Sequence, residues 1–297
     1  MDHAGRRGWA ELSEYVSGGP FRDGTDCVRE TAYAKINLAL HIRARREDGY
    51  HELETLFAFV DTGDVLSATR AVNDRLETLG EFAAVLDNPF DNIVARAMNA
   101  LPRDGGLAVT LEKNLPVAAG LGGGSADAGA LFRIVRELHG LPDDWRERAA
   151  RLGADVPACV ESVTAIGRGT GTELEPLDDG SLDGLEVLLV NPRIPLSTGP
   201  VFAAWDGEDR SALPVGTARE IALAGRNDLE APALSLCPAI SDVLQALCDT
   251  DPLLARMSGS GATCFALFED AQSRDIAAAR IAEREPGWWQ MKGSLRC

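Results

Sequence analysis

The sequence has few basic residues for its length, and this scarcity excludes several classes of function. Its 297 residues include 29 Lys and Arg against 46 Asp and Glu, which gives a formal net charge of -17 at pH 7. Nucleic acids and anionic membranes bind proteins through basic surfaces, so neither is the expected partner. Aromatic residues are also scarce, at 6%, and no basic stretch alternates with them as a nucleic-acid interface requires.

Long apolar runs are missing as well. Residues 56–60 and 201–205 are among the longest runs, whereas about 18–20 residues are needed to span a bilayer. Arg6 and Arg7 stand near the N-terminus, but acids and glycines follow where a signal peptide needs an apolar stretch. We therefore expect a cytoplasmic protein that is not embedded in a membrane.

Cysteine and histidine show no ligand spacing. The six cysteines include no CxxC pair, and the four histidines are scattered. This pattern favours reduced thiols over disulfides and predicts no metal site. With 45% hydrophobic and 25% charged residues, the composition is that of a globular protein with a substantial core.

Hydrophobic periodicity predicts strands mixed with helices. From Thr31 to Arg43 the even positions are apolar, and the odd positions include Lys35 and Asn37. This alternation predicts a strand with one face in the core and those two polar residues together on the other face. An Asp48-Gly49 turn and a returning strand at 51–60 follow. Further strands are predicted at 107–111, 186–190 and on both sides of a turn at 258–261, and helices at 93–101, 128–138, 143–152, 217–224, 239–249 and 271–285.

This order of elements favours an α+β fold, because strands and helices do not alternate as regular βαβ units. Residues 207–218 are polar and rich in turn formers, which makes them a candidate boundary loop. Residues 1–29 are rich in glycine and charge, and we expect a loosely ordered extension there.

A glycine-rich segment, residues 115–127, carries the strongest chemical signal. Its four glycines between 120 and 124 leave the backbone bare, so that N–H groups can approach a polyphosphate closely. A helix that starts near Ser125 would add unpaired donors and a partial positive charge. The segment is not a Walker A loop, which ends in Gly-Lys-Ser/Thr, nor a Rossmann fingerprint, since Ser125 replaces the third glycine. Taken alone, it could also be a flexible loop with a serine cap.

Three other features each have a structural and a functional interpretation. Asp155 could accept a proton from a substrate hydroxyl, although an aspartate shortly before a proline is more often a turn or cap residue. Lys35 could serve a site or simply be solvated. The segment 257–263, Met-Ser-Gly-Ser-Gly-Ala-Thr, is either a hairpin turn or a second backbone cradle for a phosphate.

Together these segments resemble the GHMP kinases. The resemblance lies in Ala34-Lys-Ile-Asn37, residues 46–57, residues 116–127, Gly153-Ala-Asp-Val-Pro157 and the turn at 257–263, and it covers about residues 31–293. The glycine loop and the late turn are shared across the family. The Asp-Gly-Tyr-His segment at 48–51 and the Gly-Ala-Asp-Val-Pro segment are much more specific, and they resemble the branch that acts on a cytidylyl-linked sugar alcohol.

The resemblance implies a two-domain α+β kinase with its active site in the cleft between the domains. On this basis we expect an N-terminal ATP-binding domain at 30–185 and a C-terminal domain at 186–297. The implied reaction transfers the γ-phosphoryl of ATP, which brings Mg²⁺ with it, to the 2-hydroxyl of 4-diphosphocytidyl-2-C-methyl-D-erythritol. This reaction belongs to the non-mevalonate pathway of isoprenoid biosynthesis. The oligomeric state stays open between monomer and homodimer.

The resemblance also implies roles for individual residues. Asp155 would be the catalytic base and Lys35 its cationic partner. The residues implied to bind ATP are Asn92, Lys113, Pro116, Val117, Ala118, Ala119, Gly120, Leu121, Gly122, Gly123, Gly124 and Ser125. Those implied to bind the cytidylyl substrate are Asn37, Tyr50, His51, Phe202 and Ser260. We expect Lys35, Lys113 and Arg168 to make the cleft locally positive despite the acidic chain.

Two alternatives remain beside this interpretation. The first is another GHMP kinase, for a homoserine- or mevalonate-type substrate, although such substrates have no base for Tyr50 to stack on. The second is a non-catalytic ligand sensor, which would be expected to lose the pair of Lys35 and Asp155. The sequence also departs from the family at Ala126, where many relatives have a serine, and at Gly129, where alanine is usual. We expect Gly129 to cost about 0.5–1 kcal/mol of helix stability.

Overall fold

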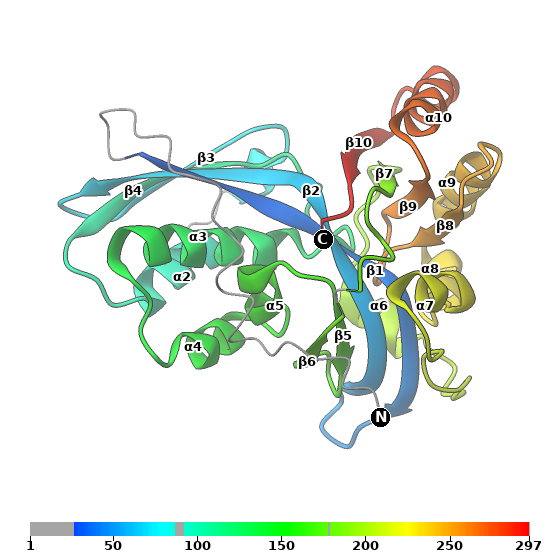
Figure 1. The fold of residues 1–297 in the computed structure, drawn as a ribbon, viewed down its shortest axis with the longest axis horizontal. Helices are drawn as coiled ribbons and strands as arrows, with labels where there is room; N and C mark the ends of the chain where they lie inside the picture. The colour runs from blue at the N-terminus through cyan, green and yellow to red at the C-terminus, as the bar shows by residue number, and fades with distance from the viewer. Residues whose placement is uncertain (1–26, 87–91, 178, 297) are drawn as a thin grey trace.

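The computed structural model describes residues 27–86, 92–177 and 179–296 (Figure 1). Residues 1–26, which make up nearly all of the predicted N-terminal extension, lie outside these ranges. Within them, no helix combines the length and the apolar character that crossing a membrane requires.

A long antiparallel hairpin runs through the whole molecule. It consists of β1 (Val28–Arg45) and β2 (His51–Ala71). The predicted Asp48-Gly49 turn joins them: Gly49 has a φ of +86°, and Asp48 Oδ1 accepts the backbone N–H of Tyr50 at 3.0 Å. Both strands are longer than predicted. The second strand was predicted to end at Val60, but β2 continues through the polar residues 61–64, where Asp64 is fully buried and accepts two backbone N–H groups.

The hairpin belongs to a first sheet of six strands among the described residues. The sheet order is β3-β4-β2-β5-β6, and β1 pairs with β2. Its other strands are β3 (Arg75–Leu79), β4 (Gly106–Glu112), β5 (Ala165–Arg168) and β6 (Glu173–Pro176). A short 3-10 helix, η1 (Ala83–Leu86), follows β3. Four helices pack against one face of this sheet (Figure 1): α2 (Ile93–Ala100), α3 (Gly123–His139), α4 (Trp145–Leu152) and α5 (Val156–Glu161).

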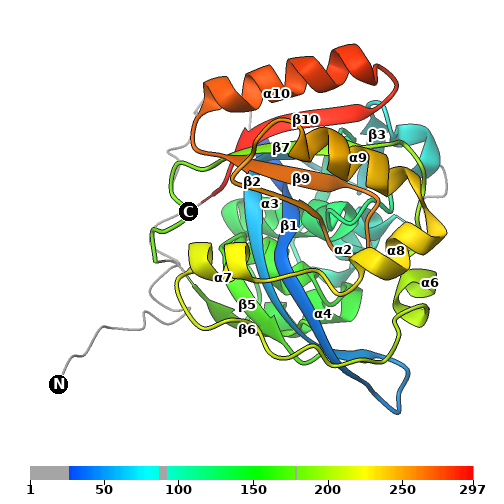
Figure 2. The same cartoon turned by 90° about the vertical axis from the view of Figure 1, so that its right-hand side faces the viewer.

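A second sheet has the order β10-β7-β9-β8 and is antiparallel throughout. Its strands are β7 (Glu186–Asn191), β8 (Leu254–Met257), β9 (Cys264–Phe268) and β10 (Trp289–Ser294). Helices α9 (Ala239–Cys248) and α10 (Ala271–Arg284) cover one of its faces (Figure 2). The remaining helices are short: α6 (Thr198–Ala203), α7 (Ala218–Ala224) and α8 (Glu230–Leu236).

The two sheets share a core through the hairpin. Val187 and Leu189 of β7 pack with Ile36 of β1, whereas the alternate residues Leu188 and Val190 pack beneath the helices. Ala34, Ile36 and Leu38 therefore face the core shared with the second sheet, and the predicted buried face is confirmed there. Ala32 packs in the core of the first sheet instead, and Leu40 lines the cleft. Lys35 and Asn37 lie on the opposite face and line a cleft, although β-bulges interrupt the alternation elsewhere in the strand. The α+β fold is confirmed.

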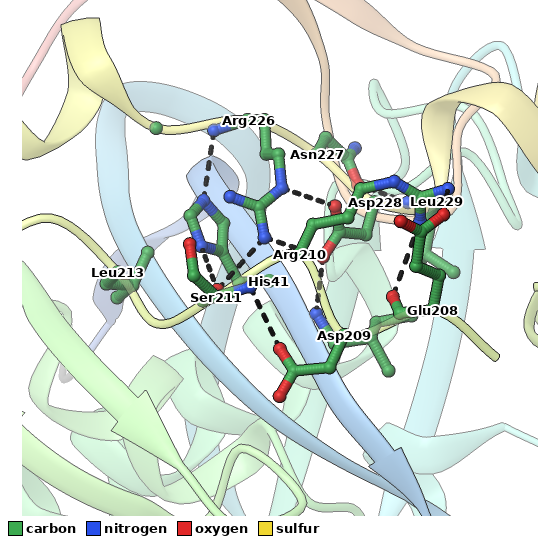
Figure 3. Close-up of polar contacts among 12 residues, drawn as sticks. His41, Glu208, Asp209, Arg210, Ser211, Leu213, Arg226, Asn227, Asp228 and Leu229 are labelled. Carbon is green, nitrogen blue, oxygen red and sulfur yellow. Dashed lines mark hydrogen bonds and ion pairs between the residues drawn. The ribbon is translucent and has the colours of Figure 1, made fainter.

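The loop at 207–218, which was predicted as a boundary, does not lie where the chain passes from the first sheet to the second. It lies along the hairpin (Figure 3). There Arg43 Nε donates to Asp209 Oδ1 at 2.9 Å, and Glu54 Oε2 accepts the backbone N–H of Leu213 at 2.7 Å. The chain changes sheets earlier, between the end of β6 at Pro176 and the start of β7 at Glu186. The domain limits at 185 and 186 remain a prediction.

Candidate active site

The glycine loop between Pro116 and Ser125 lines a cleft of about 1080 Å³. Gly120 and Gly122 have φ values of +76° and +62°, which only glycine adopts readily. A Cβ on Gly120 would lie 2.3 Å from the carbonyl oxygen of Ser258, so the loop packs directly against the turn at 258–261. Helix α3 begins at Gly123, and its unpaired N–H groups lie beside the cleft. This surface is suited to a polyphosphate.

Lys35 and Asp155 meet at the edge of this loop. Lys35 Nζ lies 2.9 Å from Asp155 Oδ2, although the two residues are 120 positions apart in the sequence. Asp155 is the N-cap residue of α5, but its side chain makes no capping hydrogen bond. The lysine is 6% exposed and the aspartate side chain 40% exposed. The carboxylate is therefore accessible to a ligand hydroxyl, and a fixed cation lies beside it.

The glycine loop also holds Lys35 in place. The backbone N–H of Lys35 donates to the carbonyl oxygen of Leu121 at 3.0 Å. Gly122 packs on the lysine side chain, since a Cβ there would lie 3.3 Å from Lys35 Cε. The bare loop thus lies over the lysine stem, and the ammonium is directed to Asp155.

Lys113 forms a buried network at the base of the loop. Its ammonium donates to Asp64 and, at 2.7 Å, to Asp127. Asp64 also accepts the backbone N–H groups of Asn114 at 2.6 Å and Leu115 at 2.7 Å. Burial opposes the charge on Lys113, but Asp127 and Asp64 outweigh this effect and raise the pKa of the lysine. Burial raises the pKa of Asp127 well above its ordinary value, and Lys113 offsets only part of the rise.

We expected Lys35, Lys113 and Arg168 to make the cleft positive, and the structure does not support this for Lys113 and Arg168. Lys113 lines the cleft, but both carboxylates engage its ammonium, so it does not offer a free positive charge to a phosphate. Arg168 is not among the cleft-lining residues and pairs with Glu175 at 2.7 Å. The basic side chains that line the cleft besides Lys113 are Lys35, Arg45 and Arg96. Much of the anion-binding capacity must therefore come from backbone N–H groups.

Aromatic side chains form another part of the cleft. The ring centroid of His51 lies 5.0 Å from that of Phe202 and 5.6 Å from that of Trp205. Burial, and then the charge of Arg45, lower the pKa of His51, so the imidazole is neutral at pH 7. Its Nε2 atom is buried and has no hydrogen-bond partner among the described residues. Tyr50, 66% exposed, lies next to it. A planar heterocycle with a polar edge fits such a pocket.

The remaining predicted polar residues are held by specific hydrogen bonds. Asn37 Nδ2 donates to Thr55 Oγ1 at 2.8 Å. Ser260 Oγ lies 3.0 Å from Thr198 Oγ1 on α6. Asn92 caps α2, as its Oδ1 accepts the backbone N–H of Val94 at 2.9 Å. The capping interaction leaves the amide nitrogen of Asn92 for a ligand.

The structure brings all but one of the predicted site residues to a single cleft. The exception is Leu121, whose side chain packs into the core shared by the two sheets, so its contribution to the loop comes from its backbone. The residues that line the cleft are Lys35, Asn37, Tyr50, His51, Asn92, Lys113, Pro116, Val117, Ala118, Ala119, Gly120, Gly122, Gly123, Gly124, Ser125, Asp155, Phe202 and Ser260.

Several cleft residues were not predicted, including Thr55, Arg45, Arg96 and Thr198. A signal for Thr55 exists in the sequence: counting by two from His51 along the predicted strand reaches it on the same face. Arg96 lies on the predicted helix four residues after Asn92, one turn along the same face. No pattern distinguishes Arg45 and Thr198 from ordinary surface residues.

Comparison with known proteins identifies the family. Residues 92–162 match the GHMP kinases N terminal domain, and residues 211–286 match the GHMP kinases C terminal family. A 4-diphosphocytidyl-2-C-methyl-D-erythritol kinase of Erythrobacter litoralis is 70% identical over 91% of this chain and 100% of its own length. The protein of the same name from Novosphingobium aromaticivorans is 66% identical over 93% of this chain and 96% of its own length.

Solved structures agree with this assignment. A crystal structure of 4-(cytidine 5'-diphospho)-2C-methyl-D-erythritol kinase superposes with a TM-score of 0.77 at 33% identity, covering 91% of this chain and 100% of that one. Homoserine kinase from Cytophaga hutchinsonii has a TM-score of 0.65 at 15% identity, covering 94% and 98% of the two chains, a likeness of fold alone. The chain therefore belongs to the GHMP kinases and, within them, to the family of the 4-diphosphocytidyl-2-C-methyl-D-erythritol kinases.

Proposed function

We propose that this chain transfers the γ-phosphoryl group of ATP to the 2-hydroxyl of 4-diphosphocytidyl-2-C-methyl-D-erythritol, giving the 2-phosphate and ADP. One observation carries the proposal. A single cleft combines a bare glycine loop, the ion pair of Lys35 and Asp155 at 2.9 Å, and a neutral His51 packed on Phe202. The loop suits a triphosphate, the ion pair suits an alcohol that loses its proton, and the aromatic pocket suits a cytosine ring.

The triphosphate would lie along residues 116–125, where backbone N–H groups can bind its oxygens. Among the described residues, no cluster of three or more His, Cys, Asp or Glu side chains could hold a metal ion. Mg²⁺ prefers substrate phosphates, water and oxygen ligands, and the hydroxyl of Ser125, which lines this cleft in the first turn of α3, suits it. When bound, Mg²⁺ neutralises charge on the transferred phosphate.

Asp155 would serve as the base for the acceptor alcohol. Its carboxylate accepts the proton of the 2-hydroxyl while that oxygen forms a bond to the γ-phosphorus. The bond between the γ-phosphorus and the bridging oxygen of ADP breaks, and ADP leaves with the electron pair. Lys35 lies 2.9 Å from the carboxylate and stabilises the negative charge that develops on the attacking oxygen. A tertiary alcohol is a weak acid, so this positioning is essential.

The cytosine ring would lie against the aromatic residues. Tyr50 and Phe202 offer ring faces for stacking. Neutral His51, with its unpartnered Nε2, can hydrogen bond to the polar edge of the base. Homoserine and mevalonate lack such a ring and would leave this pocket unused.

Initial rates of ADP release test the proposal directly. With MgATP, we expect turnover with 4-diphosphocytidyl-2-C-methyl-D-erythritol and none with homoserine or mevalonate. Base stacking on an aromatic ring contributes roughly 1–3 kcal/mol, so Tyr50→Ala should raise the KM for the cytidylyl substrate about tenfold or more. The KM for ATP should stay unchanged. Turnover with homoserine or mevalonate alone would contradict the proposal, and an unchanged KM in Tyr50→Ala would remove the stacking role.

A further inference from the structure

The amide of Asn37 has one defined orientation in the cleft, and a residue not assigned to the reaction fixes it. We propose that Thr55 is a positioning residue: its hydroxyl holds the Asn37 amide so that Oδ1 faces the cleft and accepts a hydrogen bond from a hydroxyl of the phosphoryl acceptor. This inference rests on the proposed function, since it requires an alcohol substrate.

Strand pairing places the two residues on one face of the hairpin. Asn37 lies opposite Phe57 in the β1–β2 register, and Thr55 lies two residues from Phe57 on β2. Residues two apart in a strand share a face, so Asn37 and Thr55 are diagonal neighbours. Both are almost completely buried, at 5% and 4% exposure. The contact between them is therefore protected from water.

The third strand fixes the direction of the Thr55 hydroxyl. Thr55 pairs with Gly167 of β5, and a Cβ at Gly167 would lie 3.2 Å from Thr55 Cγ2. The methyl group therefore occupies the space beside the glycine. A β-branched side chain has few χ1 rotamers, so this packing directs the hydroxyl toward β1.

The polarity of the hydrogen bonds then determines how the Asn37 amide is turned. Thr55 Oγ1 donates its single proton to the carbonyl oxygen of Ala39 at 2.7 Å. A carbonyl oxygen can only accept, so toward Asn37 the hydroxyl oxygen can only accept as well. The group that faces it, at 2.8 Å, must be the donor Nδ2. The opposite orientation would place two acceptors against each other.

Asn37 Oδ1 consequently points to the ligand side. It has no hydrogen-bond partner within the described ranges 27–86, 92–177 and 179–296. A Cβ at Gly259 would lie 3.1 Å from this atom, and both residues line the cleft. Lys35, two residues earlier on the same strand face, extends to Asp155. Asn37 Oδ1 can only accept hydrogen bonds, so it does not bind an ionised phosphate, which has no proton to donate. A substrate hydroxyl close to the reacting alcohol can donate to it.

Thr55→Val tests the inference, because valine keeps the shape of threonine and removes the hydroxyl. We expect kcat/KM for the cytidylyl substrate to fall about 10- to 100-fold, the usual effect of losing a buried hydrogen bond and its partner. The KM for MgATP should change less than about threefold, because Asn37 does not face the phosphates. Thr55→Ser keeps the hydroxyl and should retain wild-type kinetics within about threefold. Equal losses in Thr55→Val and Thr55→Ser would overturn the inference.

A double-mutant cycle separates positioning from a purely structural effect. If Thr55 acts through Asn37, Thr55→Val should add less than about threefold to the loss caused by Asn37→Ala. Full additivity of the two losses would overturn the inference. Wild-type protein without turnover would instead refute the proposed function, and an active wild type with an unaffected Thr55→Val would refute only the role of Thr55.

A second variant covers the case in which Thr55→Val does not fold. Asn37→Ala removes the amide and leaves Thr55 in place. If Oδ1 accepts a hydrogen bond from a hydroxyl of the phosphoryl acceptor, kcat/KM for the cytidylyl substrate should fall about 10- to 100-fold in Asn37→Ala, while the KM for MgATP changes less than about threefold. An unchanged kcat/KM for the cytidylyl substrate in Asn37→Ala would overturn the inference.

Discussion

Asp155 combines an exposed carboxylate with few structural contacts, so its role in catalysis can be separated from folding. Its carboxylate pairs with Lys35, and its carbonyl oxygen accepts the backbone N–H of Cys159. We expect Asp155→Asn to lower kcat by about 10²- to 10⁴-fold, the usual contribution of a general base. The thermal midpoint should change by only a few degrees. Steady-state kinetics and thermal denaturation measure the two effects.

Asp144 supplies a matched control for this substitution. It is also an N-cap aspartate without a capping hydrogen bond, and it pairs with Arg148 at 2.8 Å on the surface of α4. Asp144→Asn should leave kcat unchanged. If Asp155→Asn turned over at the wild-type rate, Asp155 would not be the base.

Individual site residues could be predicted from the sequence where a motif fixes their identity, but their interactions could not. The glycine loop and the Gly-Ala-Asp-Val-Pro segment located Asp155 and the bare backbone, which line one cleft. The position of Lys113 between Asp64 and Asp127 could not be predicted, because this contact depends on how β2 and α3 pack around the segment that follows β4. Thr55 was overlooked for the same reason, since its role depends on the pairing of three strands.

Helix α3 packs so closely on α5 in this chain that one of its glycines has no space for a Cβ atom. A Cβ at Gly129 would lie 2.5 Å from the carbonyl oxygen of Cys159. From helix propensity alone, we expected glycine at position 129 to be less stabilising than alanine. The close contact with Cys159 predicts the opposite order. Gly129→Ala should destabilise the protein by roughly 1–3 kcal/mol, the usual cost of overpacking. Urea denaturation measures the change.

Gly124→Ala in the same helix is the control. The nearest atom to a Cβ there is Ile93 Cγ2 at 3.5 Å, an ordinary contact. Alanine at this position should leave the free energy of unfolding unchanged or raise it by up to about 1 kcal/mol. Equal stability of Gly129→Ala and wild type would show that α3 and α5 can separate without cost.

The loop along β1 depends on a neutral histidine (Figure 3). The Nδ1 atom of His41 lies 3.1 Å from the carbonyl oxygen of Ser211, and Nε2 accepts the backbone N–H of Arg226 at 3.2 Å. Only the neutral ring with its proton on Nδ1 satisfies both contacts. Burial, and then the charge of Arg226, lower the pKa of His41 below its ordinary value of 6.5.

This contact predicts a loss of stability in acid. The unfolded chain takes up the proton near pH 6.5, while the folded protein resists it. The stabilisation is therefore complete above pH 6.5 and is lost as the pH falls below that value toward the lowered pKa. Between pH 7.5 and 5.5, the free energy of unfolding should fall less in His41→Gln than in wild type. An identical decrease in both proteins would contradict the role of His41.

Long elements could be predicted from periodicity, whereas several short ones could not. The seven-residue helix α7 and the short strands β7, β8 and β9 were predicted. The helices now seen at 239–248 and 271–284 and the strand at 106–112 agree with their predicted positions within a few residues. Helices α5, α6 and α8 were not predicted, because six or seven residues carry too little of a 3.6-residue period to stand out. Strands β5 and β6 have four residues each; β5 pairs with the edge of β2, and β6 pairs with β5.

The molecule as a whole combines an acidic chain with a cleft for anionic ligands. Its net charge of -17 says little about this cleft, because backbone N–H groups and a few cations set the field there. Residues from both halves of the chain line it, with Lys35 and Ser125 in the first half and Asp155, Phe202 and Ser260 in the second. That these distant segments meet in one cleft was expected only from the family resemblance. No local pattern in the sequence shows which distant segments come together.

Phosphorus NMR of the reaction product tests the central claim most directly. Purified protein would be incubated with MgATP and 4-diphosphocytidyl-2-C-methyl-D-erythritol, and in parallel with homoserine and with mevalonate. We expect a new phosphomonoester resonance on the cytidylyl compound, assigned to its 2-oxygen, with the diphosphate intact and no product from the other two alcohols. A phosphomonoester on homoserine or mevalonate, or none on the cytidylyl compound while ATP is consumed, would contradict the claim.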